Sequence, residues 1–270
     1  MTFGDPQQEG LTARFGLKLK TVQRQLELAE RDYQHQVKLR NQTLDRLSFK
    51  AGESFNAWDP GHQMYWWSYF PAAFRCPHQV ERYGPIDDGG RWMCGMEIYA
   101  ESPRRPKCIV YSFGLRDVTQ WEEDVLARTN CEIWGFDASL SQLGERRETK
   151  VDTRGIVWQT LQMIMQRLGH TWIDILKVDI EGFEFETFHS LMDSNDILPF
   201  SQLQIELHVR DIAFHTFLEF WRRWEDKGLR PFWAEVNPHP AVYLREVPWA
   251  SEYSFINTKG AHQNLLIQNY

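Results

Sequence analysis

Two different periods of apolar residues run along the second half of this 270-residue chain. Short runs that are apolar almost throughout predict buried strands, and longer segments with apolar residues every three or four positions predict amphipathic helices. The predicted strands lie at 108–114, 132–139, 174–182 and 202–209, followed by two β-rich runs at 229–236 and 252–259. The predicted helices alternate with them and lie at 121–129, 158–169, 185–195 and 213–228. This alternation predicts an α/β fold with a mostly parallel sheet that helices cover on both faces.

A further long helix is predicted over residues 14–47, ahead of the alternating region. Apolar residues recur there mostly in steps of four and three, and proline and glycine are absent between Leu17 and Lys50. This heptad character supports two interpretations equally: a stalk that joins two chains in a homodimer, or a helix that packs on its own domain. We therefore divide the chain into an N-terminal helix, an aromatic-rich lead-in of loops and short turns, a main domain and a tail, at 1–50, 51–107, 108–260 and 261–270.

The composition excludes several classes of protein and partner. Hydrophobic residues make up 42% of the chain and charged residues 25%, which is typical of a globular protein and not of a disordered one. The formal net charge of -7 gives no overall attraction for nucleic acid, so none is expected as a partner. No stretch approaches the roughly 20 apolar residues of a membrane span, and the N-terminus lacks an apolar signal region. As written, the chain is expected in the cytosol.

The four cysteines show no spacing typical of a zinc site. Cys108 and Cys131 lie in or beside apolar strand-like runs and are expected to be inert thiols of the core. Cys76 and Cys94 flank a polar loop and could form a disulfide, but only in an oxidising compartment. The interpretation as free thiols is therefore favoured.

Polar residues collect where the predicted strands end. In an open parallel sheet, ligands bind in the crevice beyond the carboxyl ends of the strands, where the strand order reverses. Asp137 follows the second strand and suits an acceptor for two ribose hydroxyls, although a turn-forming aspartate would look the same. The residues collected at these ends are Ser112, Phe113, Gly114, Asp137, Asp179, Glu181, Glu206 and His208.

The acids after the strand "DILKVD" are the most informative of these residues. Asp179 could cap the next helix, but the four carboxylates of "DIEGFEFE" exceed the need of one cap. Glu206 and His208 lie two residues apart on one strand and so point to the same face. They could form a general-base pair or only a buried hydrogen bond. Asp179, Glu181 and His208 could also bind a metal, but their spacing does not require one, and none is expected.

Taken in order, the motifs "VYSFG", "FDAS", "IDILKVDIEGFEFETF", "LQIELH", "LRPFWAEVN" and "EYSFI" resemble those of the FkbM-like S-adenosylmethionine-dependent methyltransferases. The chain is most similar to a eukaryotic, fungal-looking branch of that group, over roughly residues 70–260. The resemblance implies a Rossmann-like methyltransferase fold with a mostly parallel, seven-strand-type sheet that ends in an antiparallel hairpin. It also implies O-methylation of a hydroxyl on a small molecule or glycan.

The same resemblance assigns roles to the residues at the strand ends. S-adenosyl-L-methionine would be the cofactor, with its methionine part at Ser112, Phe113 and Gly114 and its ribose at Asp137 and Ala138. Asp179 would lie beside the sulfonium. Removal of a proton from the acceptor hydroxyl needs a base, for which the resemblance offers Asp179, Glu181 or His208.

Two departures from the family pattern favour a second hypothesis. The loop "LRDVTQ" directly after Gly114 contains no further glycine, and the segment 140–157 is shorter than in the family, which predicts a sheet that lacks part of one strand. These departures favour a catalytically inactive, methyltransferase-like scaffold that captures partners. A nicotinamide-dependent oxidoreductase is disfavoured, because no GxGxxG motif opens the first helix.

The resemblance also bears on the compartment. Relatives in this branch often carry a membrane anchor and a stem ahead of the catalytic domain, and residues 14–47 resemble such a stem. If the full protein carries an anchor, a Golgi-lumen location, a Cys76–Cys94 disulfide and glycosylation at Asn41 of "NQT" are implied together.

Overall fold

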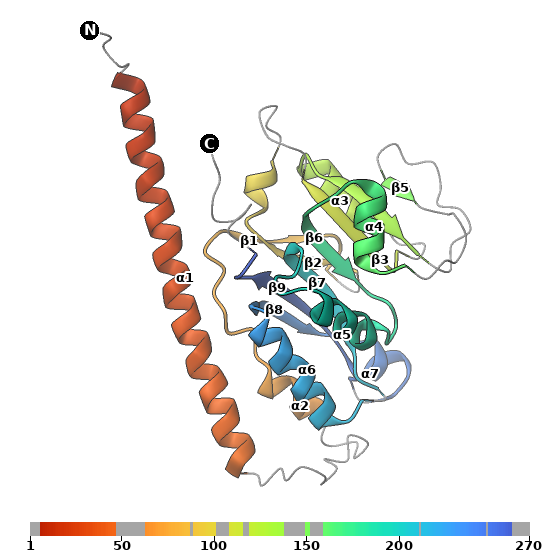
Figure 1. The fold of residues 1–270 in the computed structure, drawn as a ribbon. Coiled ribbons are helices and arrows are strands. Elements are labelled where there is room, and N and C mark those ends of the chain that lie inside the picture. The colour runs from red at the N-terminus through yellow and green to blue at the C-terminus, as the bar shows by residue number, and fades with distance from the viewer. Residues whose placement is uncertain are drawn as a thin grey trace.

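The centre of the molecule is one seven-stranded sheet with the strand order β5-β4-β3-β6-β7-β9-β8 (Figure 1). The computed structural model describes residues 6–46, 63–86, 89–100, 108–115, 119–137, 149–151, 159–210, 212–246 and 248–260. The strands of the sheet are β3 (Ile109–Phe113), β4 (Glu132–Phe136), β5 (Thr149–Val151), β6 (Ile173–Val178), β7 (Phe200–His208), β8 (Leu229–Val236) and β9 (Ala250–Asn257). Neighbouring strands are parallel, except that β9 runs antiparallel to both β7 and β8.

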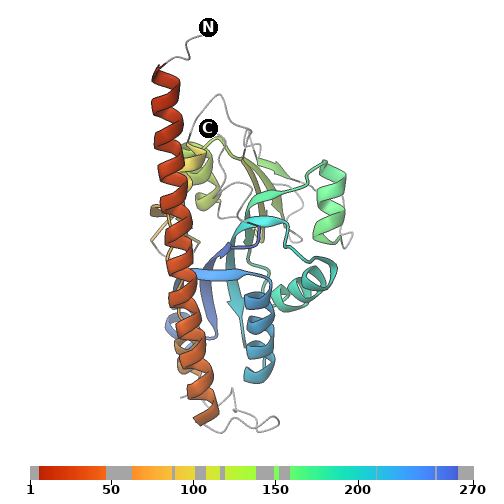
Figure 2. The ribbon, with the colours of Figure 1, turned by 60° about the vertical axis from the view of Figure 1, so that its left-hand side comes forward.

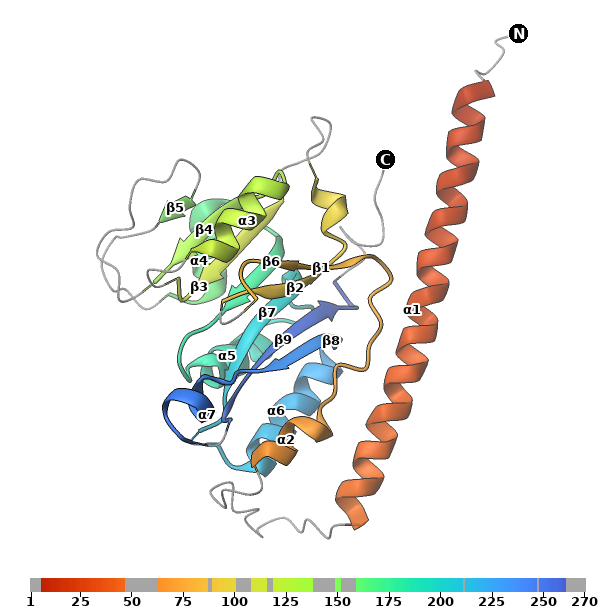
Figure 3. The same ribbon diagram turned by 180° about the vertical axis from the view of Figure 1, so that it is seen from behind.

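Each face of the sheet carries its own hydrophobic core. One core joins the sheet to α2 (Gln63–Tyr69), α4 (Leu161–Leu168), α5 (Glu184–Ser194) and α6 (Phe214–Asp226). The other lies under α3 (Gln120–Arg128) and a hairpin of β1 (Val80–Tyr83) and β2 (Arg91–Cys94). Figure 3 shows the molecule from the side that carries α3 and this hairpin. Because both faces are covered, β6 and β7 are buried along their whole length, as near-continuous apolar runs predict.

The fold predicted from the alternating pattern is confirmed. Every strand and helix predicted from residue 108 onward is present, with ends shifted by a few residues, and the last two strands form the antiparallel hairpin. The short strand β5 pairs in parallel with β4, so the sheet has its third strand on this side. It arises within the segment 140–157 that the sequence predicts to be shortened; the rest of that segment lies outside the described residues, as does Ala138.

The prediction of loops and short turns for 51–107 is only partly right. The lead-in contains α2, the β1–β2 hairpin and a 3-10 helix, η1 (Met96–Tyr99). Gly89 and Gly90 of the predicted "DDGG" turn precede β2, and its two aspartates lie outside the described residues. The hairpin docks on the main sheet through the Gln202 side chain, which accepts from Cys94 N–H at 3.0 Å and donates to Cys94 O at 2.7 Å. These contacts join segments that are distant in sequence, so no local sequence pattern predicts them.

The helix α1 (Pro6–Arg46) lies along one side of the domain, as Figure 2 shows. Its C-terminal half packs on that domain through buried apolar residues and through Glu225 of α6, which accepts hydrogen bonds from Tyr33 at 2.6 Å and Arg40 at 2.7 Å. Arg230 forms a two-pronged ion pair with Glu30 at 2.7 and 2.8 Å. The interpretation of a helix packed on its own domain therefore holds for this half, and homodimerisation through 14–47 stays a prediction. No helix in the described part of the chain is long and apolar enough to cross a membrane.

The expectation of free thiols is wrong for all four cysteines. Cys76 pairs with Cys94, and Cys108 pairs with Cys131. The second pair arises because Cys108 and Cys131 precede the neighbouring parallel strands β3 and β4, which brings their Cα atoms to 4.2 Å. Sequence reasoning treated each cysteine by its own surroundings and missed that the sheet places the two side by side.

We expect the protein purified from an oxidising compartment to contain no free thiols. Alkylation of the unfolded, unreduced chain should then label no cysteine, and labelling after reduction should reach four. Each bridge closes a loop of 18 or 23 residues, so its loss should lower the free energy of unfolding by about 3 kcal/mol. The double variants C76S/C94S and C108S/C131S separate the two bridges. Four labelled thiols without reductant would contradict the assignment.

Candidate functional site at the carboxyl ends of the strands

The carboxyl ends of β3, β4 and β6 meet at Gly114. The Gly114 N–H donates to the Phe136 carbonyl oxygen at 2.9 Å, and the Asp179 N–H donates to that of Phe113 at 3.1 Å. Gly114 has φ +80°, and a Cβ atom there would overlap the Asp179 carbonyl oxygen, so only glycine fits. The chain runs outward from β3 to β5 and then returns to β6 on the other side of β3. This junction is therefore the point of strand-order reversal, where open α/β sheets bind ligands.

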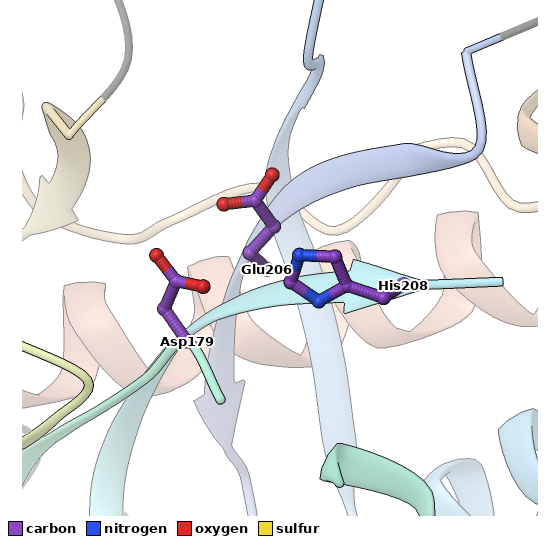
Figure 4. Close-up of side chains that lie close together, drawn as sticks. All are labelled: Asp179, Glu206 and His208. Atoms are coloured by element: carbon purple, nitrogen blue, oxygen red, sulfur yellow. The ribbon is translucent and has the colours of Figure 1, made fainter. Parts of the chain in front are cut away.

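Three side chains converge beside this junction. Asp179 follows β6, while Glu206 and His208 lie on β7, and one potential metal-ligating atom of each lies within 4.8 Å of the others (Figure 4). Glu206 and His208 are only 4% and 8% exposed, whereas the Asp179 side chain is 22% exposed. The group thus opens to solvent on the side of Asp179. The prediction that Glu206 and His208 share one face is confirmed, and Asp179 joins them.

Arg91 of β2 reaches this group from outside the main sheet. Its Nη2 lies 3.9 Å from Asp179 Oδ2 and 3.8 Å from Glu206 Oε2, and its Nη1 lies 2.5 Å from Glu252 Oε1 on β9. The arginine is only 2% exposed. A single buried guanidinium therefore faces carboxylates from β6, β7 and β9. Sequence reasoning missed Arg91 and Glu252; the signal available was an arginine directly before the short apolar run "WMC".

Glu184, the first residue of α5, fixes the orientation of His208. It is fully buried and accepts hydrogen bonds from the backbone N–H groups of Ile180 and Gly182 at 3.0 Å. Its Oε1 lies 3.1 Å from Nδ1 of His208. Because an ionised carboxylate only accepts, Nδ1 carries the proton in this pair. Neither Asp179 nor Glu184 caps α5, because the N-cap residue is Phe183 and no side chain caps the helix there.

Glu181 lies at the open side of the same group. Its side chain is 52% exposed, and its Oε2 lies 3.6 Å from His208 Nε2. It has φ +55°, which is rare for a residue other than glycine, and such strain occurs most often at functional sites. The three predicted catalytic residues, Asp179, Glu181 and His208, therefore lie together in the structure.

Burial and neighbouring charges shift the pKa values of Glu206 and His208. Burial raises the pKa of Glu206, the charge of Asp179 raises it further, and Arg91 opposes both. Burial is the largest single effect on the pKa of His208 and lowers it, but the hydrogen bond to Glu184 and the charges of Glu184, Glu206 and Asp179 together leave the pKa raised. The raised pKa of His208 therefore reflects the carboxylates around it, whereas that of Glu206 reflects burial first.

The predicted cofactor residues have varied surroundings. The Ser112 hydroxyl is buried and donates to Glu122 Oε1 at 2.6 Å, so its side chain is turned into the core below α3. Phe113 stacks on Phe136 with ring centroids 4.6 Å apart. Asp137 is half-buried directly after β4, at the edge of the strand-order reversal. Contacts with a ligand through β3 would therefore involve its backbone and Gly114, whereas Asp137 offers a carboxylate.

A cavity of about 140 Å³ adjoins the group on the side of β8 and β9. Glu252 lines this cavity and also binds Arg91, which faces the acidic group. The cavity is lined by Arg82, Ile86, Glu235, Val236, Asn237, Pro238 and Glu252. Asn237 also donates to Glu206 at 2.6 Å, which ties the cavity wall to the buried group.

Comparison with known protein families finds a match that ends at β5, so Asp179, Glu206 and His208 lie outside the matched residues. A family model described as "Methyltransferase domain" matches residues 24–152, which include the hairpin, β3 and β4. The matched family is that of a methyltransferase domain. The match does not distinguish an FkbM-like or fungal branch, so those finer resemblances stay predictions.

Curated relatives point to the same class. The chain is 25% identical over 176 residues to the probable methyltransferase-like protein 24 of Homo sapiens, covering 54% of this chain and 48% of that protein. The protein of the same name from Rattus norvegicus matches with the same identity and coverage. The chain thus spans about half the length of the curated relatives that it matches.

Three solved structures are similar to parts of this chain at low sequence identity. M. capricolum TrmK in complex with S-adenosyl-homocysteine is 10% identical, with a TM-score of 0.37, over 57% of this chain and 64% of that one. A chain of a fibrillarin/Nop5p complex is 13% identical, with a TM-score of 0.41, over 57% and 74%. The human methyltransferase 10 domain containing protein is 9% identical, with a TM-score of 0.38, over 59% and 76%.

The close approach of Gly114 to the Asp179 carbonyl oxygen leads us to expect a large effect of substitution on stability. Gly114→Ala must push the ends of β3 and β6 apart, so the free energy of unfolding should fall by about 3 kcal/mol or more. Gly169→Ala is the matched control, because Gly169 has a similar φ of +74° but nothing within 4 Å of an added Cβ. It should cost only about 1–2 kcal/mol. Equal losses in urea unfolding would contradict the packing described at the junction.

Proposed function

We propose that the protein is an S-adenosylmethionine-dependent methyltransferase that acts on a hydroxyl oxygen. The observation that carries this proposal is the set of groups at the strand-order reversal: Gly114 on β3, Asp137 on β4, and Asp179 on β6. The sheet brings these three positions to one edge although they are far apart in sequence. The methyltransferase-domain match supports the class of reaction.

The residues at this edge fit the parts of S-adenosylmethionine by their chemistry. The Asp137 carboxylate suits the two ribose hydroxyls, because it can accept a hydrogen bond from each. The absence of a side chain at Gly114 leaves the backbone after β3 open to close approach. Asp179 offers a negative charge to the cofactor's sulfonium, whose positive charge activates the methyl group for transfer.

The methyl acceptor would bind at the solvent-exposed side of the acidic group formed by Asp179, Glu206 and His208. Transfer to a hydroxyl oxygen needs alignment of the two reactants and a base that takes the proton. Glu181 is the most exposed of the three predicted bases and lies at this opening, so we assign the proton to its carboxylate. The adjoining cavity supports a hydroxylated acceptor such as a small polyol or glycan. Its two glutamates, one asparagine and one arginine can form hydrogen bonds with hydroxyls.

The two disulfides support the alternative of an oxidising compartment over the cytosol. A Golgi-lumen location would place the protein where glycans are available as acceptors. The catalytically inactive scaffold remains the second candidate function, and the observation that favours it is the short β5 beside a segment that the family pattern leads one to expect longer.

Calorimetric titration with S-adenosylhomocysteine tests the proposal. We expect saturable binding to the folded protein, and at least a tenfold loss in Asp137→Ala, because two hydrogen bonds to a carboxylate are worth about 1.5–3 kcal/mol each. Asp196→Ala, which removes an exposed acid after α5, should bind as the unmodified chain does. A folded protein that binds no cofactor product would refute the proposal and leave the scaffold as the better account.

A further inference from the structure

The buried group at β6 and β7 holds more negative than positive charge. Arg91 is the one guanidinium that the described residues place against it, and its closest partner is Glu252, at 2.5 Å. Arg91 lies 3.8–3.9 Å from the other two carboxylates that it faces, which is beyond hydrogen-bond distance. The carboxylates in this network are Asp179, Glu184, Glu206 and Glu252. Four carboxylates thus face one arginine and one histidine, and such a buried set offers more ligand oxygens than these two side chains can pair with.

The orientation of His208 is a second and independent observation. Its Nδ1–H is held by the buried Glu184 carboxylate, which directs Nε2 toward the opposite side of the ring. Among the described residues, no group forms a hydrogen bond with His208 Nε2. Its ion-pair partner is Glu181, whose Oε2 lies 3.6 Å from Nε2. The side chain is nevertheless 91% buried, with 9% of its surface exposed. A neutral imidazole held by a carboxylate in this way is the usual arrangement of a histidine that ligates a metal.

We propose that Asp179, Glu206 and His208 bind one divalent transition-metal ion. The three ligand atoms lie within 4.8 Å of one another, and they come from two adjacent strand ends of the rigid sheet. Metal–ligand bonds of about 2.0–2.2 Å allow ligand atoms to lie up to roughly 4.4 Å apart, so a small rotation of the more exposed Asp179 completes the set. Positions on the open side of Asp179 are left for water or for a substrate oxygen.

The mixed ligand set decides the class of ion. Two carboxylates and one imidazole suit Mn²⁺ or a similar first-row ion better than Mg²⁺ or Ca²⁺, which prefer oxygen ligands throughout. If the proposed function is correct, on which this step rests, the ion lies between the cofactor edge and the acceptor cavity. It can then hold the acceptor hydroxyl oxygen and lower the pKa of that hydroxyl, while Glu181 takes the proton.

Titration of the metal-free protein with Mn²⁺, followed by the electron paramagnetic resonance signal of the free ion, tests the site directly. We expect one ion per chain at neutral pH and binding weakened at least tenfold in Glu206→Gln and in His208→Gln. Glu184→Gln should weaken binding about 10–100-fold, because it removes only the group that orients His208. Asp193 is an exposed acid on the same helix as Glu184, and it pairs with Arg223 of α6. Asp193→Asn should therefore leave Mn²⁺ binding unchanged.

The outcomes separate the metal site from the proposed function. Circular dichroism establishes first that each variant is folded, and Zn²⁺ competition establishes that one site is titrated. No binding at millimolar Mn²⁺, or binding that is the same in Glu206→Gln and His208→Gln, would overturn the inference. The Mn²⁺ titration contains no cofactor, so the two binding tests are independent. The protein can fail to bind Mn²⁺ and still bind S-adenosylhomocysteine, or bind Mn²⁺ and not S-adenosylhomocysteine.

Discussion

The placement of Arg91 is the contact on which the site depends. A guanidinium that is only 2% exposed faces carboxylates from β6, β7 and β9, which would otherwise repel one another at the edge of a buried sheet. Loss of one partner from such a buried set leaves uncompensated charge, at a cost of roughly 3–5 kcal/mol. The β1–β2 hairpin that carries Arg91 is therefore a part of the site, although it lies outside the seven-stranded sheet.

Several contacts hold the β1–β2 hairpin, and with it Arg91, against the main sheet. Gln202 of β7 ties the backbone of Cys94 to the sheet, and the Cys76–Cys94 bridge ties the hairpin to the chain ahead of it. Arg82 of the hairpin pairs with Glu235 of β8 at 2.6 Å. Together these contacts fix β2 against β7, β8 and β9, which holds the Arg91 guanidinium at the acidic group.

Local pattern was enough to predict the sheet and half of the site. Buried parallel strands such as β6 and β7 read as apolar runs, and polar residues at their carboxyl ends, Asp179 and His208, stand out against them. What the sequence could not supply were contacts that depend on how the folded strands, hairpin and helices come together. The Cys108–Cys131 bridge, the reach of Arg91 and the hold of Glu184 on His208 each join residues whose neighbours in sequence give no sign of the partner.

The central claim is that one edge of this sheet gathers a cofactor, a cation and an acceptor. A crystal structure of the protein with S-adenosylhomocysteine and Mn²⁺ tests it most directly. The account predicts the ribose at Asp137, the cofactor sulfur on the side of Asp179, and an anomalous manganese peak between Asp179, Glu206 and His208. Cofactor density elsewhere on the molecule, or an ordered site in which Arg91 or a water takes the place of the ion, would contradict it.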